Sequence, residues 1–223
     1  MTNDVLARLV VTALIFSAIS FYWQFHRALA RGRATTFAPA RGDARRGAVY
    51  ALTLGMNPRA KDGARRHPWV LVAGVLFHAG VGAAAITAVA LFAARPGFSG
   101  PAWDAIATVQ AAGAIAALSL IARRNASPML RAISGSDDYV SNILVFATLV
   151  SGAGAIALPE LVPMFATALT LVLVYAPFGK IRHCVLFFPA RLQYGRFLGR
   201  RGVLPPASGA DLSVRTRPRG SEQ

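Results

Sequence analysis

Five long runs of apolar residues are the feature that most constrains what this chain can fold into. They lie at about 6–25, 69–94, 103–121, 139–158 and 161–188. Each is long enough to cross the hydrocarbon core of a bilayer, which takes about 20 residues of helix. Backbone polar groups in lipid must be satisfied within the protein, so runs of this length indicate helices. The sequence therefore predicts an all-α membrane protein, a five-transmembrane-helix bundle.

Charge is separated from these runs along the chain. The net charge is +15, although 55% of the 223 residues are hydrophobic. Ten lysines and arginines lie between Arg27 and Arg66, whereas the short segment after the second run carries only Arg95. Because basic loops stay on the cytoplasmic side, we predict an external N-terminus and a cytoplasmic C-terminus in a bacterial inner (plasma) membrane. An odd number of spans likewise puts the two termini on opposite sides of the membrane.

The domain organisation follows from the same pattern. We expect one membrane domain over 1–204, with a basic cytoplasmic loop over 27–68 and a disordered cytoplasmic tail over 205–223. The apolar segment 47–56 between arginines predicts a short interfacial helix within that loop. We expect the first run to be a span and not a signal peptide, because it lacks a clear basic leader and a cleavage site.

The basic residues favour some partners over others. Nucleic-acid binding is disfavoured because the arginines flank apolar runs and form no separate module. Most of them serve membrane topology, and a docking surface for an acidic cytoplasmic partner remains a second interpretation. The single cysteine, Cys184, excludes an internal disulfide and a cysteine-held cluster in this chain. Iron–sulfur chemistry would therefore belong to another subunit.

Two histidines lie inside the apolar runs. His78 is about 13 Å along the second run, and His183 is about 9 Å before the end of the fifth, at 1.5 Å per residue. A histidine in lipid is costly unless a partner takes its ring nitrogens. Two histidines at one depth predict the axial ligands of a haem iron in the bundle core. The alternative is that each bonds to a neighbouring carbonyl or hydroxyl group.

Other residues near these runs have weaker interpretations. Lys180 and Arg182 precede the second of these histidines and would pair with haem propionates, or extend to lipid phosphates instead. His26 ends the first run in a region typical of an aromatic belt, and His67 lies just before a proline at the membrane surface. We expect structural roles for these last two. No residue of the chain is predicted to be catalytic.

Four segments resemble the gamma subunit of respiratory nitrate reductase and its broader family of haem b membrane subunits that oxidise quinol. The segments are LVAGVLFHAGV at 71–81, SPMLRA at 127–132 followed by Asp138, PFGKIRHCV at 177–185, and FFPARLQYGRFLGRRG at 187–202. The resemblance covers most of 69–201. It implies that His78 and His183 ligate haem b, with Lys180 in register.

The chain departs from the nitrate-reductase members of that family at one point. Those members hold a second haem nearer the outside, whose ligands would fall at Ala88 and Phe165. Neither residue can ligate iron, so the resemblance implies one haem b and puts the outer quinol site in doubt.

The resemblance also implies a function. The chain would be a membrane-anchoring cytochrome b subunit of a quinone-linked oxidoreductase complex. It would transfer electrons between the quinone pool and a cytoplasmic iron–sulfur or other redox subunit docked on the basic face, in either direction. A haem-free structural anchor is the main alternative. A small transporter is less favoured because the outer half offers few ionisable residues, and Asp104 there is expected to be solvated.

Overall fold

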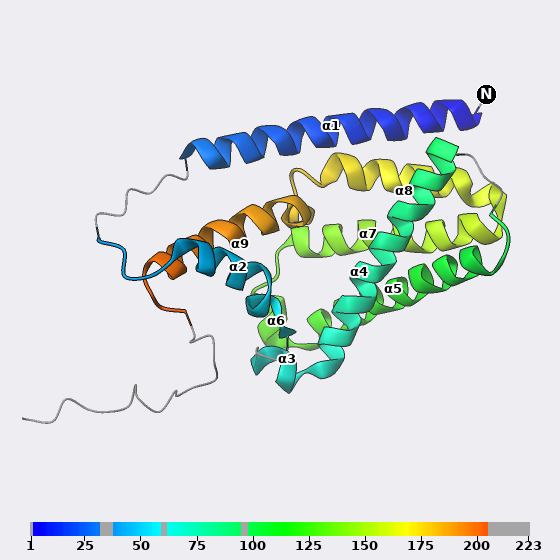
Figure 1. Ribbon diagram of the computed structural model, residues 1–223. Coiled ribbons are helices and arrows are strands. Elements are labelled where there is room, and N and C mark those ends of the chain that lie inside the picture. Colours follow the sequence, from blue (N-terminus) through cyan, green and yellow to red (C-terminus); the bar gives the residue numbers. More distant parts are fainter. Residues whose placement is uncertain (1, 32–37, 59–61, 95–97, 205–223) are drawn as a thin grey trace, which may run out of the picture. The chain divides into compact units, whose positions relative to one another are not determined.

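The apolar runs form long helices. The computed structural model describes residues 2–31, 38–58, 62–94 and 98–204, and these contain helices and turns but no strand (Figure 1). Four helices in the described part are long and apolar enough to span a membrane, and they coincide with the first four predicted runs. A bent pair of helices adds a fifth span if the pair is counted as one. The predicted all-α, multi-pass membrane class is confirmed, while the orientation of the termini stays a prediction.

The described residues fall into two compact units. The first unit takes in residues from 1–34 and 57–187, and the second takes in residues from 35–56 and 188–223. The first unit contains α1 (Thr2–Arg31), α3 (Asp62–Arg66), α4 (Pro68–Val89) with a π-helical turn η3 (Ala90–Ala94), α5 (Pro101–Ala126), α6 (Pro128–Ala132), α7 (Ser136–Ala157), the 3-10 turn η4 (Pro159–Leu161), α8 (Val162–Tyr175), the 3-10 turn η5 (Lys180–Arg182) and the start of α9 (His183–Arg200).

Small residues bring the helices of the first unit together. Helix α4 contacts α5, α5 contacts α7, α7 contacts α8, and α8 contacts α1 (Figure 1). A Cβ atom on Gly113 would lie 2.9 Å from the Cα of Gly80, so the backbones of α4 and α5 meet with no room for a side chain. Helices in lipid associate through such close packing, because lipid tails are as apolar as the helix surface and the hydrophobic effect gives little drive for association.

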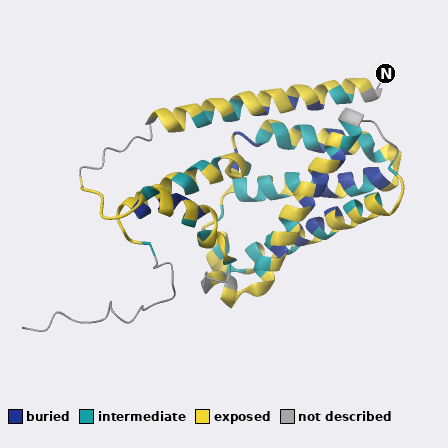
Figure 2. Ribbon diagram, viewed as in Figure 1, coloured by how far each residue is buried: buried dark blue, intermediate teal, exposed yellow. Residues whose placement is uncertain are grey.

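The interior of the first unit is mostly apolar, with a polar contact between two of its helices. We call its centre the Phe165 core: Ala84, Ala114, Leu149, Ala155 and Phe165. The amide of Gln110, also fully buried, donates to the hydroxyl of Thr87 over 2.9 Å. The outward faces of the helices remain exposed (Figure 2) and carry large apolar side chains, as expected for a surface covered by lipid.

The fifth predicted run is not one straight helix. It is divided into α8 and α9, which are bent by 77° at a break over residues 176–179. Pro177 lacks a backbone N–H group and so cannot continue the hydrogen-bond ladder. A Cβ atom on Gly179 would overlap the ring of Tyr175, so only glycine fits after the bend. The continuous helix predicted over 161–188 is therefore replaced by two helices with a break between them.

The second unit is a pair of short helices. It consists of α2 (Ala44–Leu52), the 3-10 turn η1 (Leu54–Met56) and the later part of α9. A Cβ atom on Gly47 would lie 2.6 Å from the Cα of Gly199, so these backbones touch. The guanidinium of Arg191 donates to the carbonyl oxygens of Ala51 and Gly55 over 2.9 and 2.7 Å. A helix was predicted at 47–56, and α2 with η1 occupies that position.

Candidate functional site

The structure brings His78 and His183 together. His78 lies on α4, and His183 is the first residue of α9, directly after η5. Their ring centroids are 6.4 Å apart, and the ring planes meet at 75°. The signals for this pairing in the sequence were the depth of the two histidines in the apolar runs and the resemblance of their segments to haem b membrane subunits.

Each histidine is oriented by a backbone carbonyl of its own segment. The Nδ1 atom of His78 is 2.7 Å from the carbonyl oxygen of Gly74, and that of His183 is 2.6 Å from the carbonyl oxygen of Lys180. A carbonyl oxygen can only accept, so Nδ1 carries the proton and donates it. This tautomer leaves the unshared electron pair on Nε2. Histidines that bind metals are held in the same way, with the second ring nitrogen donating to a carbonyl or carboxylate.

The separation of the two rings fits a single metal between them. An imidazole–metal bond is about 2 Å long and the ring centre lies about 1 Å beyond the nitrogen, so two opposed imidazoles have centroids roughly 6 Å apart. A bare ion would need three or four protein ligands. In the described residues no group of three or more His, Cys, Asp or Glu side chains is placed to hold one. A haem iron needs only two protein ligands, and this donor set fits it.

The two rings line a small open pocket at the surface of the bundle. We call it the histidine pocket; its volume is about 210 Å³ and its walls are Phe77, His78, Val81, Asp138, Ser141, Asn142, Val145, Lys180, Ile181, His183 and Cys184. Ligand pockets commonly hold about 300–1,000 Å³, so a macrocycle would extend beyond these walls. Both histidines are exposed, whereas the sequence placed them in the bundle core. For His183 the reason is the bend before it, because this residue begins α9 directly after the break.

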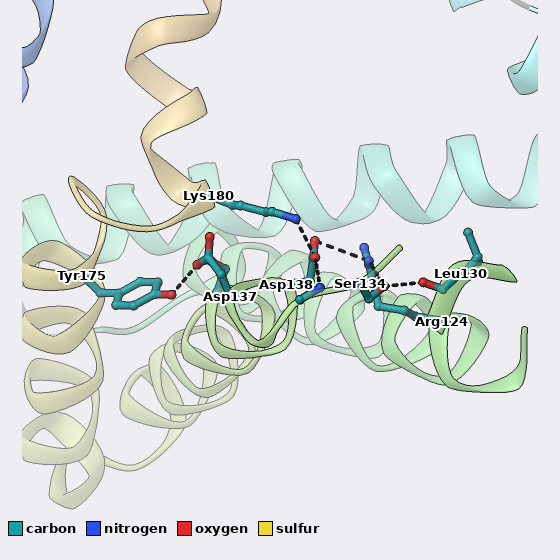
Figure 3. Close-up of polar contacts among 9 residues, drawn as sticks. Arg124, Leu130, Ser134, Asp137, Asp138, Tyr175 and Lys180 are labelled. Atoms are coloured by element: carbon teal, nitrogen blue, oxygen red, sulfur yellow. Dashed lines mark hydrogen bonds and ion pairs between the residues drawn. The ribbon is translucent and has the colours of Figure 1, made fainter. Parts of the chain in front are cut away.

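Polar contacts hold the bend that positions His183. At the start of α7, Asp137 accepts a hydrogen bond from the hydroxyl of Tyr175 (Figure 3). It accepts another from the hydroxyl of Ser141. From the opposite side, the amide of Gln24 on α1 donates to the carbonyl oxygen of Pro177 over 2.8 Å. Helices α1 and α7 therefore both contact the break between α8 and η5.

Lys180 is already paired within the protein. Its Nζ atom donates to a carboxylate oxygen of Asp138 over 2.5 Å, and Arg124 lies 3.4 Å from the other oxygen (Figure 3). The same carboxylate accepts from the backbone N–H of Gly135 over 3.0 Å, which caps α7. A propionate would share Lys180 with Asp138. Arg182 is exposed and does not line the pocket.

Most of this polar cluster was not predicted from the sequence. The resemblance includes Asp138 without implying a role for it, and it implies no role for Asp137 or Tyr175. The available signals were two adjacent acidic residues just before an apolar run, where they can begin a helix, and Pro177 and Gly179 inside the last run. The contacts could not be predicted, because Tyr175 and Lys180 lie on opposite sides of a bend whose direction the sequence does not give.

The remaining histidines lie elsewhere in the first unit. The ring of His26 lies on α1, with its centroid 6.3 Å from that of Tyr22. His67 is the residue before α4 and makes no side-chain capping bond. Neither lines the histidine pocket. Ala88 and Phe165, where a second pair of ligands would fall, both belong to the apolar interior around Leu149.

Comparisons with known proteins add no family. No family model, no curated protein and no solved structure matches this chain.

Proposed function

We propose that this chain is a membrane-anchoring cytochrome b subunit that carries one haem b between His78 and His183. The observation that carries the proposal is the histidine pair itself. The two rings have the separation of axial ligands, and each donates through Nδ1 to a carbonyl, which leaves Nε2 for a metal. The resemblance of four segments to the haem b membrane subunits supports the same assignment.

The residues of the histidine pocket have separate roles in this proposal. The carbonyl oxygens of Gly74 and Lys180 orient the two imidazoles and increase their basicity as ligands. Phe77, Val81 and Val145 provide an apolar wall that limits access of water. Lys180, with Arg182 two residues later, provides the positive charge that we assign to the propionates.

The bound haem would supply one-electron redox chemistry. In the proposed complex the chain connects the quinone pool to an iron–sulfur or other redox subunit on the cytoplasmic side, in either direction of electron flow. The basic segments of the first unit are the surface that we assign to that subunit. The five-span topology with an external N-terminus belongs to the same proposal, because it puts the histidine pocket in the cytoplasmic half.

An absorption spectrum of the purified chain tests the proposal. We expect a Soret band and paired α and β bands after reduction, with one haem per chain by haemochrome assay. Reduction of the haem by an added quinol would support the link to the quinone pool. A chain that folds in the membrane without any haem would contradict the proposal and support a structural anchor. Two haems per chain would contradict the assignment of a single ligand pair.

A further inference from the structure

The second unit carries a concentration of arginine with almost no compensating acid. Its described residues include seven arginines and a single carboxylate, Asp43. That carboxylate accepts a hydrogen bond from the backbone N–H of Arg45 over 2.7 Å and caps α2. The arginines are Arg41, Arg45, Arg46, Arg191, Arg196, Arg200 and Arg201.

Large apolar side chains are exposed beside these arginines. On α2 and η1 the most exposed are Val49 at 57% and Leu54 at 63%, and on α9 Tyr194 is exposed at 59%. Further exposed apolar residues of the second unit are Leu52, Met56, Phe188, Phe197 and Val203. The guanidinium of Arg201 lies 4.8 Å from the centre of the Phe197 ring. Arginine and exposed aliphatic and aromatic groups therefore alternate over the same two helices.

Helices α2 and α9 pack against each other through small residues, so their larger side chains point outward. Gly47, Gly195 and Gly199 are buried where α2 meets α9. Exposed Arg45, Val49 and Leu52 follow one another at four- and three-residue spacing, so they share one face of α2. The arrangement is a helix pair with a glycine seam inside and a basic, apolar surface outside.

We infer that this surface lies on a bilayer and binds anionic phospholipid headgroups. Helices that rest in the interface combine basic residues with exposed aliphatic and aromatic groups, and arginine attracts anionic lipid at that surface. Leu54, Val49 and Tyr194 enter the boundary of the acyl chains, while the exposed arginines bind phosphates. A purely electrostatic contact with an acidic soluble protein would leave this apolar surface in water. The inference does not depend on haem.

A spin label on Leu54 tests this inference in the full-length chain. Leu54→Cys is made in a Cys184→Ser background, which leaves one labelling site. The protein is reconstituted into vesicles of phosphatidylcholine alone or with phosphatidylglycerol. We expect the label to collide more often with lipid-soluble oxygen than with an aqueous nickel chelate when phosphatidylglycerol is present. In phosphatidylcholine alone this ratio should fall several-fold.

Charge variants with a matched control separate lipid binding by the second unit from the effect of lowering the net charge of the chain. Arg46→Gln/Arg196→Gln removes two charges from the second unit, and we expect the label to move into water in the phosphatidylglycerol vesicles. Arg65→Gln/Arg66→Gln removes two charges from exposed residues of the first unit and should leave the label immersed. Arg45→Gln/Arg46→Gln is a second variant with the same expected effect as the first. All five arginines are exposed, so the variants should fold.

Three results would overturn the inference. One is a label that stays in water in both kinds of vesicle. The second is equal immersion in phosphatidylcholine alone, which would show apolar contact without headgroup recognition. The third is a label in water in vesicles that becomes protected only when an acidic protein partner is added.

Discussion

The histidine pocket and the Phe165 core are built from the same helices but differ in character. Helix α4 contributes His78 to the pocket and Ala84 to the core. The α8–α9 segment contributes His183 to the pocket and Phe165 to the core. The pocket is open, with ring nitrogens and charges along its wall, whereas Phe165 is fully buried among alanines and a leucine. A cofactor site is therefore expected at the histidine pocket, and tight packing is expected in the Phe165 core.

The largest effect is expected from the histidine pair. His78→Ala or His183→Ala removes one axial ligand, so haem should be lost completely from either variant. The reduced-minus-oxidised spectrum of the purified protein measures this. Normal haem content in either variant would show that the pair does not hold the iron.

Removal of the large side chain in the core should affect stability and not the spectrum. Phe165→Ala leaves a cavity and should cost about 3–5 kcal/mol of unfolding free energy, as for buried aromatic residues elsewhere. Thermal or denaturant unfolding in detergent measures the loss. The haem bands of the folded protein should keep their positions. Phe178→Ala is a control, because Phe178 is exposed at 66%. Loss of haem from folded Phe165→Ala would place a haem in the Phe165 core. The core would then not differ from the histidine pocket as a cofactor site.

A smaller effect is expected where the bend is held. Tyr175→Phe removes the hydroxyl that donates to Asp137 and should cost about 1 kcal/mol, the usual net contribution of one hydrogen bond. Haem should be retained, with its midpoint potential shifted because His183 is held less firmly. Potentiometric titration measures the shift, and Tyr22→Phe is the matched control on α1. An unchanged potential together with unchanged stability would show that this contact does not position the ligand.

The smallest effect is expected at the histidine outside the pocket. His26→Ala should leave haem content and band positions unchanged, because His26 does not line the histidine pocket. The reduced-minus-oxidised spectrum of the purified variant measures both. Loss of the Soret band would mean that the ligand pair has been chosen wrongly.

Several features could be predicted without the structure. Helical spans follow from long apolar runs, because lipid leaves the backbone no partner but itself. The choice of His78 and His183 followed from depth, since helical rise converts sequence position into distance along the membrane normal. Small residues within the spans favour close helix packing, and the contact of Gly80 with Gly113 is an example. The sequence of one span does not show which residue of another span it will meet.

Only the tertiary structure decided what surrounds the two histidines. The bend before His183 depends on a local contact of Gly179 with the ring of Tyr175 and on a long-range hydrogen bond from the hydroxyl of Tyr175 to a carboxylate of α7. The same bend puts Lys180 beside Asp138, and both histidine rings are exposed. Hydropathy measures the affinity of each segment for lipid, so it located the helices. It contains no term for contacts between side chains on different helices, and those contacts determine the geometry of the pocket.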